Sequence, residues 1–104
     1  MLHRKSFTQI HKNPADILEK LIRFNTTNPP GNETACINYI HDLLNDAGIQ
    51  SIILAKKPER PNLIAHIDGR GKANPILLYG HVDVVGTDNQ QWDIPPFDGK
   101  IIDG

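Results

Sequence analysis

Apolar positions recur with a helical period in the first half of the chain and change to short extended runs in the second half. The first helical stretch begins at Asn13 and Pro14, a pair typical of a helix N-terminus, and predicts a helix over residues 14–24. Its apolar residues fall on one stripe: Ile17, Leu18, Leu21, Ile22 and Phe24. This stripe is the face that the helix is expected to bury.

A loop of sequence NTTNPPGN follows, and its prolines and glycine end any continuous helix. Asn32 is expected to cap a second helix with Glu33 in its first turn, and the apolar stripe predicts that this helix covers residues 33–47. Gly48 follows at the position where a helix commonly ends in a left-handed residue. The two helices are therefore predicted to be joined by a loop of defined shape.

Extended runs come after the second helix: IQSIILA, PNLIAHIDG, PILLYG and, near the end, KIID. The segment DGRGKANP between the second and third runs is typical of a reverse turn and predicts an antiparallel pair, with Leu63, Ala65 and Ile67 on one face. Residues 76–79, ILLY, are apolar on both sides. We expect them to form the most central strand, covered above and below.

Two helices and about four strands predict an α/β fold in which two N-terminal helices pack on a partial mixed sheet. Residues 1–12 have no clear period and are expected to be a leader, whereas residues 13–104 are expected to form one domain. So few elements do not cover both faces of a buried strand, so we expect the domain to be incomplete.

Composition narrows the classes of partner. The chain has 104 residues, of which 22% are charged, and a formal net charge of −1; this balance, without a run of like charge, argues against nucleic acid. No apolar stretch reaches the ~18 residues of a membrane span, and no signal-peptide pattern is present, so the cytoplasm is the expected location. The single cysteine, Cys36, fits a reducing compartment and is expected to be a small buried residue rather than a reactive thiol.

His81 and Asp83 lie directly after the apolar run LLYG, and the carboxyl end of a strand commonly carries ligands and catalytic groups. Residues two apart in an extended chain point the same way, so both side chains are predicted to face one cavity. Three roles suit the pair: a metal ligand oriented by a carboxylate, a base for a serine or cysteine nucleophile, and a structural hydrogen bond. The second role is disfavoured because the chain has no nucleophile-elbow sequence.

The segment LLYGHVDVVG, followed by W, PPF and DG, resembles the first half of a zinc-dependent peptidase and amidohydrolase family. That family includes carboxypeptidase G, aminoacylase, acetylornithine deacetylase and succinyl-diaminopimelate desuccinylase. The segment NTTNPPGNE is similar to the family's loop between its first two helices. The resemblance runs from about Asp16 onward and implies that residues 13–104 are the N-terminal portion of a metallopeptidase-like catalytic domain.

The same resemblance implies the roles of the site residues. His81 is the first ligand of a paired-zinc site, and Asp83, the candidate catalytic residue, is the carboxylate that supports it. The family's other ligands and its general base match no segment of this chain, and a catalytic zinc usually has three protein ligands. The isolated chain is therefore expected to be an inactive fragment that retains no zinc, from an enzyme that hydrolyses the amide bond of a small N-acyl amino acid or peptide.

The other candidate residues are expected to be structural. Trp92, Pro96 and Phe97 are expected to pack against the edge of the sheet, and Asp88 and Asp93 to be solvated. The remaining histidines are expected at strand or surface positions outside the site: His3, His11, His41 and His66.

Two alternatives to an enzyme fragment remain open. In the first, the chain is a non-catalytic α/β module that pairs an exposed strand edge with itself or with another protein. In the second, it is a structural metal domain that binds zinc tightly, which a single cysteine disfavours.

Overall fold

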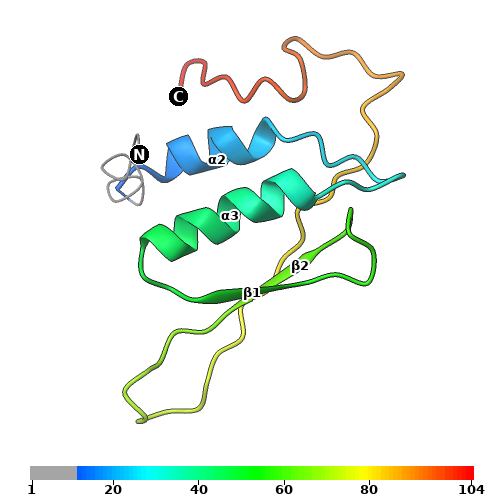
Figure 1. Cartoon of the computed structure of the whole chain (residues 1–104). Coiled ribbons are helices and arrows are strands. Elements are labelled where there is room, and N and C mark those ends of the chain that lie inside the picture. The colour runs from blue at the N-terminus through cyan, green and yellow to red at the C-terminus, as the bar shows by residue number, and fades with distance from the viewer. Residues whose placement is uncertain (1–11) are drawn as a thin grey trace.

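The fold is that of a computed structural model in which residues 12–104 are described (Figure 1). Two helices precede two strands: α2 (Pro14–Ile22), α3 (Thr34–Asp46), β1 (Ser51–Leu54) and β2 (Asn62–Ala65). The predicted leader, residues 1–12, lies outside the described residues except for its last one. Within the described part of the chain, no helix is long and apolar enough to cross a membrane.

α2 lies where the apolar stripe predicts a helix, and it ends two residues earlier than expected. It begins at Pro14, and Asn13 is its N-cap as predicted, although the Asn13 side chain makes no capping hydrogen bond. The Asn13 carbonyl accepts a hydrogen bond from the Asp16 amide at 3.1 Å instead. The proline at the first helical position therefore marks this start more directly than the cap does.

α3 also matches its prediction to within one residue at each end. Its N-cap is Glu33 rather than Asn32, which shifts the first helical residue to Thr34. At the other end Gly48 has a φ of +78°, and its amide donates to the Asn45 carbonyl at 3.0 Å. The predicted left-handed glycine after the second helix is confirmed.

Aromatic and small apolar side chains join the helices. The rings of Phe24, just beyond α2, and Tyr39 of α3 have centroids 5.7 Å apart, and the Lys20 ammonium lies 5.4 Å from the first and 5.8 Å from the second. Cys36 and Ile37 of α3 are the buried hydrophobic residues of the described part of the chain. The prediction that Cys36 is a buried helical residue is confirmed, and the core around it is small.

β1 and β2 pair in antiparallel register, with Ser51 opposite Ala65 and Ile53 opposite Leu63. Ser51 Oγ lies 2.6 Å from Nδ1 of His41 in α3, so this face of the pair lies against α3 (Figure 1). Leu63 and Ala65 therefore share one face, as predicted, whereas the prediction is wrong for Ile67, which lies beyond β2 and is exposed. His41 was expected at the surface, but this contact leaves it half-buried.

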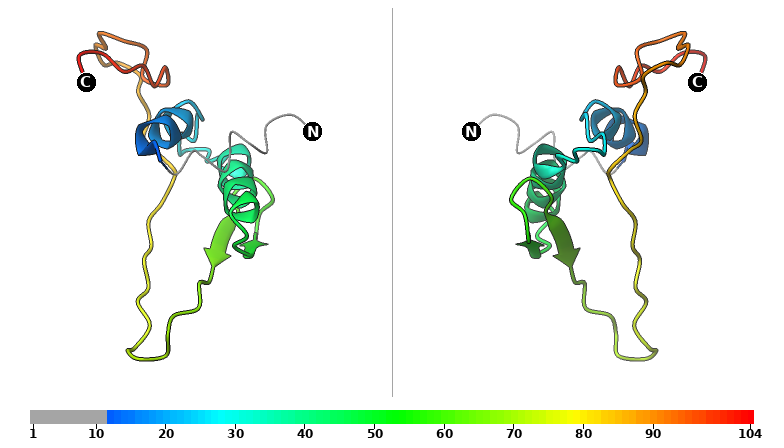
Figure 2. Two further views of the ribbon diagram at one scale, coloured as in Figure 1. Left: turned by 90° about the vertical axis from the view of Figure 1, so that its left-hand side faces the viewer. Right: turned by 90° about the vertical axis from the view of Figure 1, so that its right-hand side faces the viewer.

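Residues 66–81, which we call the arm, run away from β2 and return toward the helices without joining the sheet (Figure 2). The predicted antiparallel pair between the second and third extended runs is wrong, because β2 pairs with β1 instead. The predicted central strand, residues 76–79, is also wrong: its four side chains are 84–93% exposed. A central strand needs a hydrogen-bonded neighbour on each side, and the described residues provide neither.

The expected partial mixed sheet is, within the described residues, a two-stranded antiparallel sheet. One isolated parallel bridge, between Thr27 and Val84, lies outside it. Residues 100–103, the last expected extended run, are not a strand. Strand pairing therefore differs most from the prediction, whereas the helices differ least.

The C-terminal segment, residues 92–104, folds back beside α2 (Figure 1). Arg23 Nε donates to the Asp98 carbonyl at 3.1 Å. Gly99, with a φ of +68°, approaches α2 so closely that a Cβ there would lie 2.6 Å from the Glu19 carbonyl oxygen. This segment is therefore attached to α2 and not to the sheet.

Candidate functional site

The backbone on either side of Asp83 is held against the loop between α2 and α3. Thr26 is buried, its hydroxyl donates to the Val82 carbonyl at 2.6 Å, and its own carbonyl accepts a hydrogen bond from the Val84 amide at 3.2 Å. The backbone N–H of Asn28 donates to the Val84 carbonyl at 2.8 Å. These hydrogen bonds fix the main chain that carries Asp83 and limit where its carboxylate can point.

His81 and Asp83 are in direct contact, as the two-residue spacing predicted. His81 Nδ1 lies 2.8 Å from Asp83 Oδ1 and 2.9 Å from the Asp83 carbonyl oxygen. Both partners are acceptors, so Nδ1 is the donor, and in the neutral ring Nε2 carries the lone pair. The His81 side chain is 82% exposed, so the lone pair on Nε2 is accessible to a metal ion or to a proton.

The second oxygen of Asp83 is also occupied. Oδ2 accepts a hydrogen bond from Asn28 Nδ2 at 3.0 Å and lies 3.5 Å from Arg60 Nη2. The hydrogen bonds from Asn28 and then His81, together with the positive charge of Arg60, hold the pKa of Asp83 below its ordinary value, although partial desolvation opposes them. Asp83 is therefore an ionised acceptor at neutral pH, with both oxygens engaged.

Arg60 connects Asp83 to a buried carboxylate, that of Glu33. Arg60 Nε lies 3.2 Å and Nη2 3.0 Å from Glu33 Oε1, and these hydrogen bonds raise the pKa of Arg60. The sequence predicts Glu33 near the start of the second helix and predicts no role for Arg60. The two residues are 27 positions apart, so no local pattern predicts their contact.

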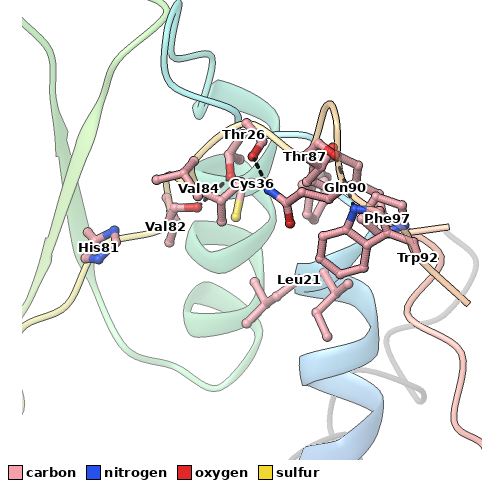
Figure 3. A pocket seen from close by; sticks show the side chains of 15 residues that line it. Leu21, Thr26, Cys36, His81, Val82, Val84, Thr87, Gln90, Trp92 and Phe97 are labelled. Carbon is pink, nitrogen blue, oxygen red and sulfur yellow. Dashed lines mark hydrogen bonds between the residues drawn. The ribbon is translucent and has the colours of Figure 1, made fainter. Parts of the chain in front are cut away.

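An apolar cavity of about 510 Å³ lies between α2, α3 and the chain that follows His81 (Figure 3). Trp92 and Phe97 lie near Leu21 of α2, and His81 lies at the opposite end. Pro96 lines the same cavity. The three residues predicted to pack against the sheet edge therefore pack toward α2, because the C-terminal segment is attached to that helix.

The other predicted positions are simple to assign. Asp88 and Asp93 are exposed, which confirms that they are solvated. His66 lies one residue beyond β2 with its side chain 83% exposed, so it is solvated as well. The predictions for His3 and His11 concern residues outside those that the structure describes.

The donor set of this site fits one metal ligand rather than a complete metal centre. Across residues 12–104, no three His, Cys, Asp or Glu side chains are grouped so that they could hold a metal ion. His81 offers one imidazole nitrogen, and Asp83 orients the ring that carries it. Since a catalytic zinc usually has three protein ligands, any complete centre needs ligands from other residues.

Comparison with known proteins finds relatives that share one name. A protein of Staphylococcus aureus named as a probable succinyl-diaminopimelate desuccinylase is 39% identical over 88 residues, which cover 83% of this chain and 21% of the relative. A probable desuccinylase of the same name from Staphylococcus epidermidis is 35% identical over 82% of this chain and 22% of its own length. The succinyl-diaminopimelate desuccinylase of Ehrlichia canis is 32% identical over 86% of this chain and 24% of its own length.

No family model and no solved structure matches the chain. The chain spans about a fifth of the length of these curated relatives. Over most of its own length, then, this chain is similar to proteins named as succinyl-diaminopimelate desuccinylases.

Proposed function

We propose that this chain is the N-terminal part of a metal-dependent hydrolase that cleaves the amide bond of a small N-acyl amino acid or peptide. The observation that carries the proposal is the His81–Asp83 pair, in which a carboxylate holds Nδ1 and leaves Nε2 accessible. Similarity to proteins named as desuccinylases supports the hydrolase class and supports membership of the zinc-dependent peptidase and amidohydrolase family.

In this proposal His81 binds the metal ion through Nε2, and Asp83 fixes the orientation and tautomer of the ring. Two zinc ions are the proposed cofactor, and when bound they would supply Lewis-acid activation of water and of the substrate carbonyl. Asp83 accepts hydrogen bonds at both oxygens, so it is poorly suited to take a proton from water. The general base and the other ligands are therefore assigned to residues outside this chain, and we expect the isolated chain to be inactive.

The proposed location is the cytoplasm. Cys36 is a free, buried thiol, and burial, followed by the nearby charge of Glu33, raises its pKa. Such a thiol is structural rather than reactive, as is common in proteins of reducing compartments.

A chimera tests the proposed function. Residues 13–104 would replace the matching segment of the Staphylococcus aureus relative, and hydrolysis of N-succinyl amino acids would be measured with zinc and after chelation. We expect zinc-dependent activity that His81→Ala lowers by about 100-fold or more. The matched control is His66→Ala, which removes an exposed histidine outside the site and should preserve the activity. Retained activity in His81→Ala, or a folded but inactive chimera, would overturn the proposal.

A second candidate function is self-association through a strand edge. It is supported by the arm, where residues 76–79 present four apolar side chains to solvent and, within the described part of the chain, join no strand. We propose a second copy of this chain as the occupant. Sedimentation velocity over a tenfold range of concentration should then show a dimer that Leu78→Lys abolishes; a monomer at every concentration would exclude this function.

A further inference from the structure

Arg60 lies between two carboxylates, and its contacts with them are unequal. Toward Glu33 it presents Nε and Nη2 at 3.0–3.3 Å, and the Glu33 side chain is almost fully buried. Toward Asp83 it presents Nη2 at 3.5 Å. Because the guanidinium is planar and rigid, the bond to Glu33 sets the direction in which Nη2 reaches Asp83.

Gly31 fixes the guanidinium from the other side. It is buried, has a φ of +79°, and a Cβ at this position would lie 2.5 Å from Arg60 Nε and 2.8 Å from Cζ. The guanidinium therefore packs directly on the backbone of the loop between the helices, in space that any other residue would fill. The same loop provides Asn28, which donates to Asp83 Oδ2 at 3.0 Å.

We infer that Arg60, held by Glu33 and packed on Gly31, is a positioning residue that aims the Asp83 carboxylate at His81. Arg60 and Asn28 occupy Asp83 Oδ2 from one side, which leaves Oδ1 facing Nδ1 of His81 at 2.8 Å. The inference deepens the proposed function, because a fixed Nδ1–H tautomer keeps the lone pair of His81 on Nε2, where a metal ion binds.

Nearby positive charge alone does not provide this geometry. Lys57 lines the same cavity of about 570 Å³ as Arg60 and Asp83. Among the described residues, however, it forms no ion pair with either carboxylate. Substitution of Lys57 therefore serves as a matched control, because it removes a nearby positive charge and leaves the contacts of Arg60 with Glu33 and Asp83 in place.

The test measures the tautomer of His81 in the 104-residue chain without metal or substrate. Long-range nitrogen–proton NMR spectra of isotope-labelled histidine at about pH 8.5, above the ordinary histidine pKa, report the ratio of Nδ1–H to Nε2–H forms. The Nδ1–H form should dominate in the wild type. Arg60→Met should lower the ratio by about threefold, the size expected for a solvent-accessible ion pair, whereas Lys57→Met should leave it unchanged.

A dispersed amide NMR spectrum shows that a variant is folded. If Arg60→Met loses this dispersion, Arg60→Lys takes its place in the test. Lysine retains a charge beside Glu33 but lacks the planar fork, so the tautomer ratio should still fall. An unchanged ratio in a folded Arg60 variant, or an equal fall in Lys57→Met, would overturn the inference. Failure of zinc-dependent hydrolysis in the chimera would remove the proposed function and leave this tautomer result as it stands, so the two failures are distinguishable.

Discussion

The polar network around Asp83 and the apolar arm meet at His81, and they differ in how their groups are satisfied. In the network, Thr26 and Glu33 are 3% and 5% exposed, and each is hydrogen-bonded within the chain. In the arm, residues 76–79 are 84–93% exposed, and in the described structure their backbone groups form no strand.

This difference has a physical reason. A buried polar group without a partner costs about 1–3 kcal/mol, so each donor and acceptor of a buried network needs a hydrogen-bond partner within that network. An exposed apolar side chain lacks only the stabilisation of burial, so it persists until another surface covers it. The orientation of Asp83 therefore depends on the loop between the helices, on Arg60 and on His81 at the end of the arm, and in the described part of the chain the exposed residues 76–79 form none of the network's hydrogen bonds with it.

Removing the buried carboxylate should break the network most strongly. Glu33→Ala leaves the Arg60 fork without its main acceptor, and we expect the free energy of unfolding to fall by about 2 kcal/mol, the scale of hydrogen bonds to charged groups. Urea denaturation followed by circular dichroism measures it. Glu59→Ala, at an exposed neighbouring position, is the control and should change little. A loss below about 0.5 kcal/mol for Glu33→Ala, the range of ordinary surface substitutions, would show that the network is not a stability element.

Thr26→Val is expected to have the next largest effect. It keeps the shape of the side chain but removes the hydroxyl that donates to the Val82 carbonyl at 2.6 Å, which should lower the free energy of unfolding by about 1 kcal/mol. Thr27→Val is the matched control, because within the described residues the Thr27 hydroxyl donates to Asn25 Oδ1, two positions away in an exposed turn. Equal effects of the two substitutions in urea denaturation would contradict a special role for the buried hydroxyl.

The pH dependence of stability should report Asp83, with a smaller effect because the site is open to solvent. The pKa of Asp83 is lowered in the folded chain, so the unfolded chain binds the proton first as the pH falls. The stability from ionised Asp83 is then fully present above about pH 4 and is lost as the pH falls through the folded-state pKa. Asp83→Asn should flatten the acid side of the unfolding profile. Asp88→Asn, at an exposed position, should follow the wild type, and an identical profile for Asp83→Asn would exclude the linkage.

The smallest effect is expected in the arm. Leu78→Ser removes a side chain that is 88% exposed, so the free energy of unfolding should stay within about 0.5 kcal/mol of the wild type. Leu63→Ser, on the face of β2 that lies against α3, is the contrasting variant and should be clearly less stable. If Leu78→Ser destabilises the chain as much as Leu63→Ser does, the arm is packed in solution and the contrast between the two regions fails.

Local sequence signals predicted the two helices and the contact between His81 and Asp83. The apolar period and Pro14 located α2, and Gly48 located the end of α3, because these signals act within one or two helical turns. The two-residue spacing of His81 and Asp83 brought the pair together for the same reason: residues two apart in an extended chain share a side.

The network that holds the pair, and the absence of strand pairing in the described arm, follow instead from contacts between residues distant in the sequence. Asn28 and Asp83 are 55 positions apart, and Arg60 and Glu33 are 27 apart, so their contacts depend on how the loop between the helices meets the segment after the arm. Residues 76–79 have the composition of a central strand, but pairing also needs neighbouring strands. A local pattern records which surface a segment can bury, whereas the partner that buries it is fixed by contacts distant in the sequence.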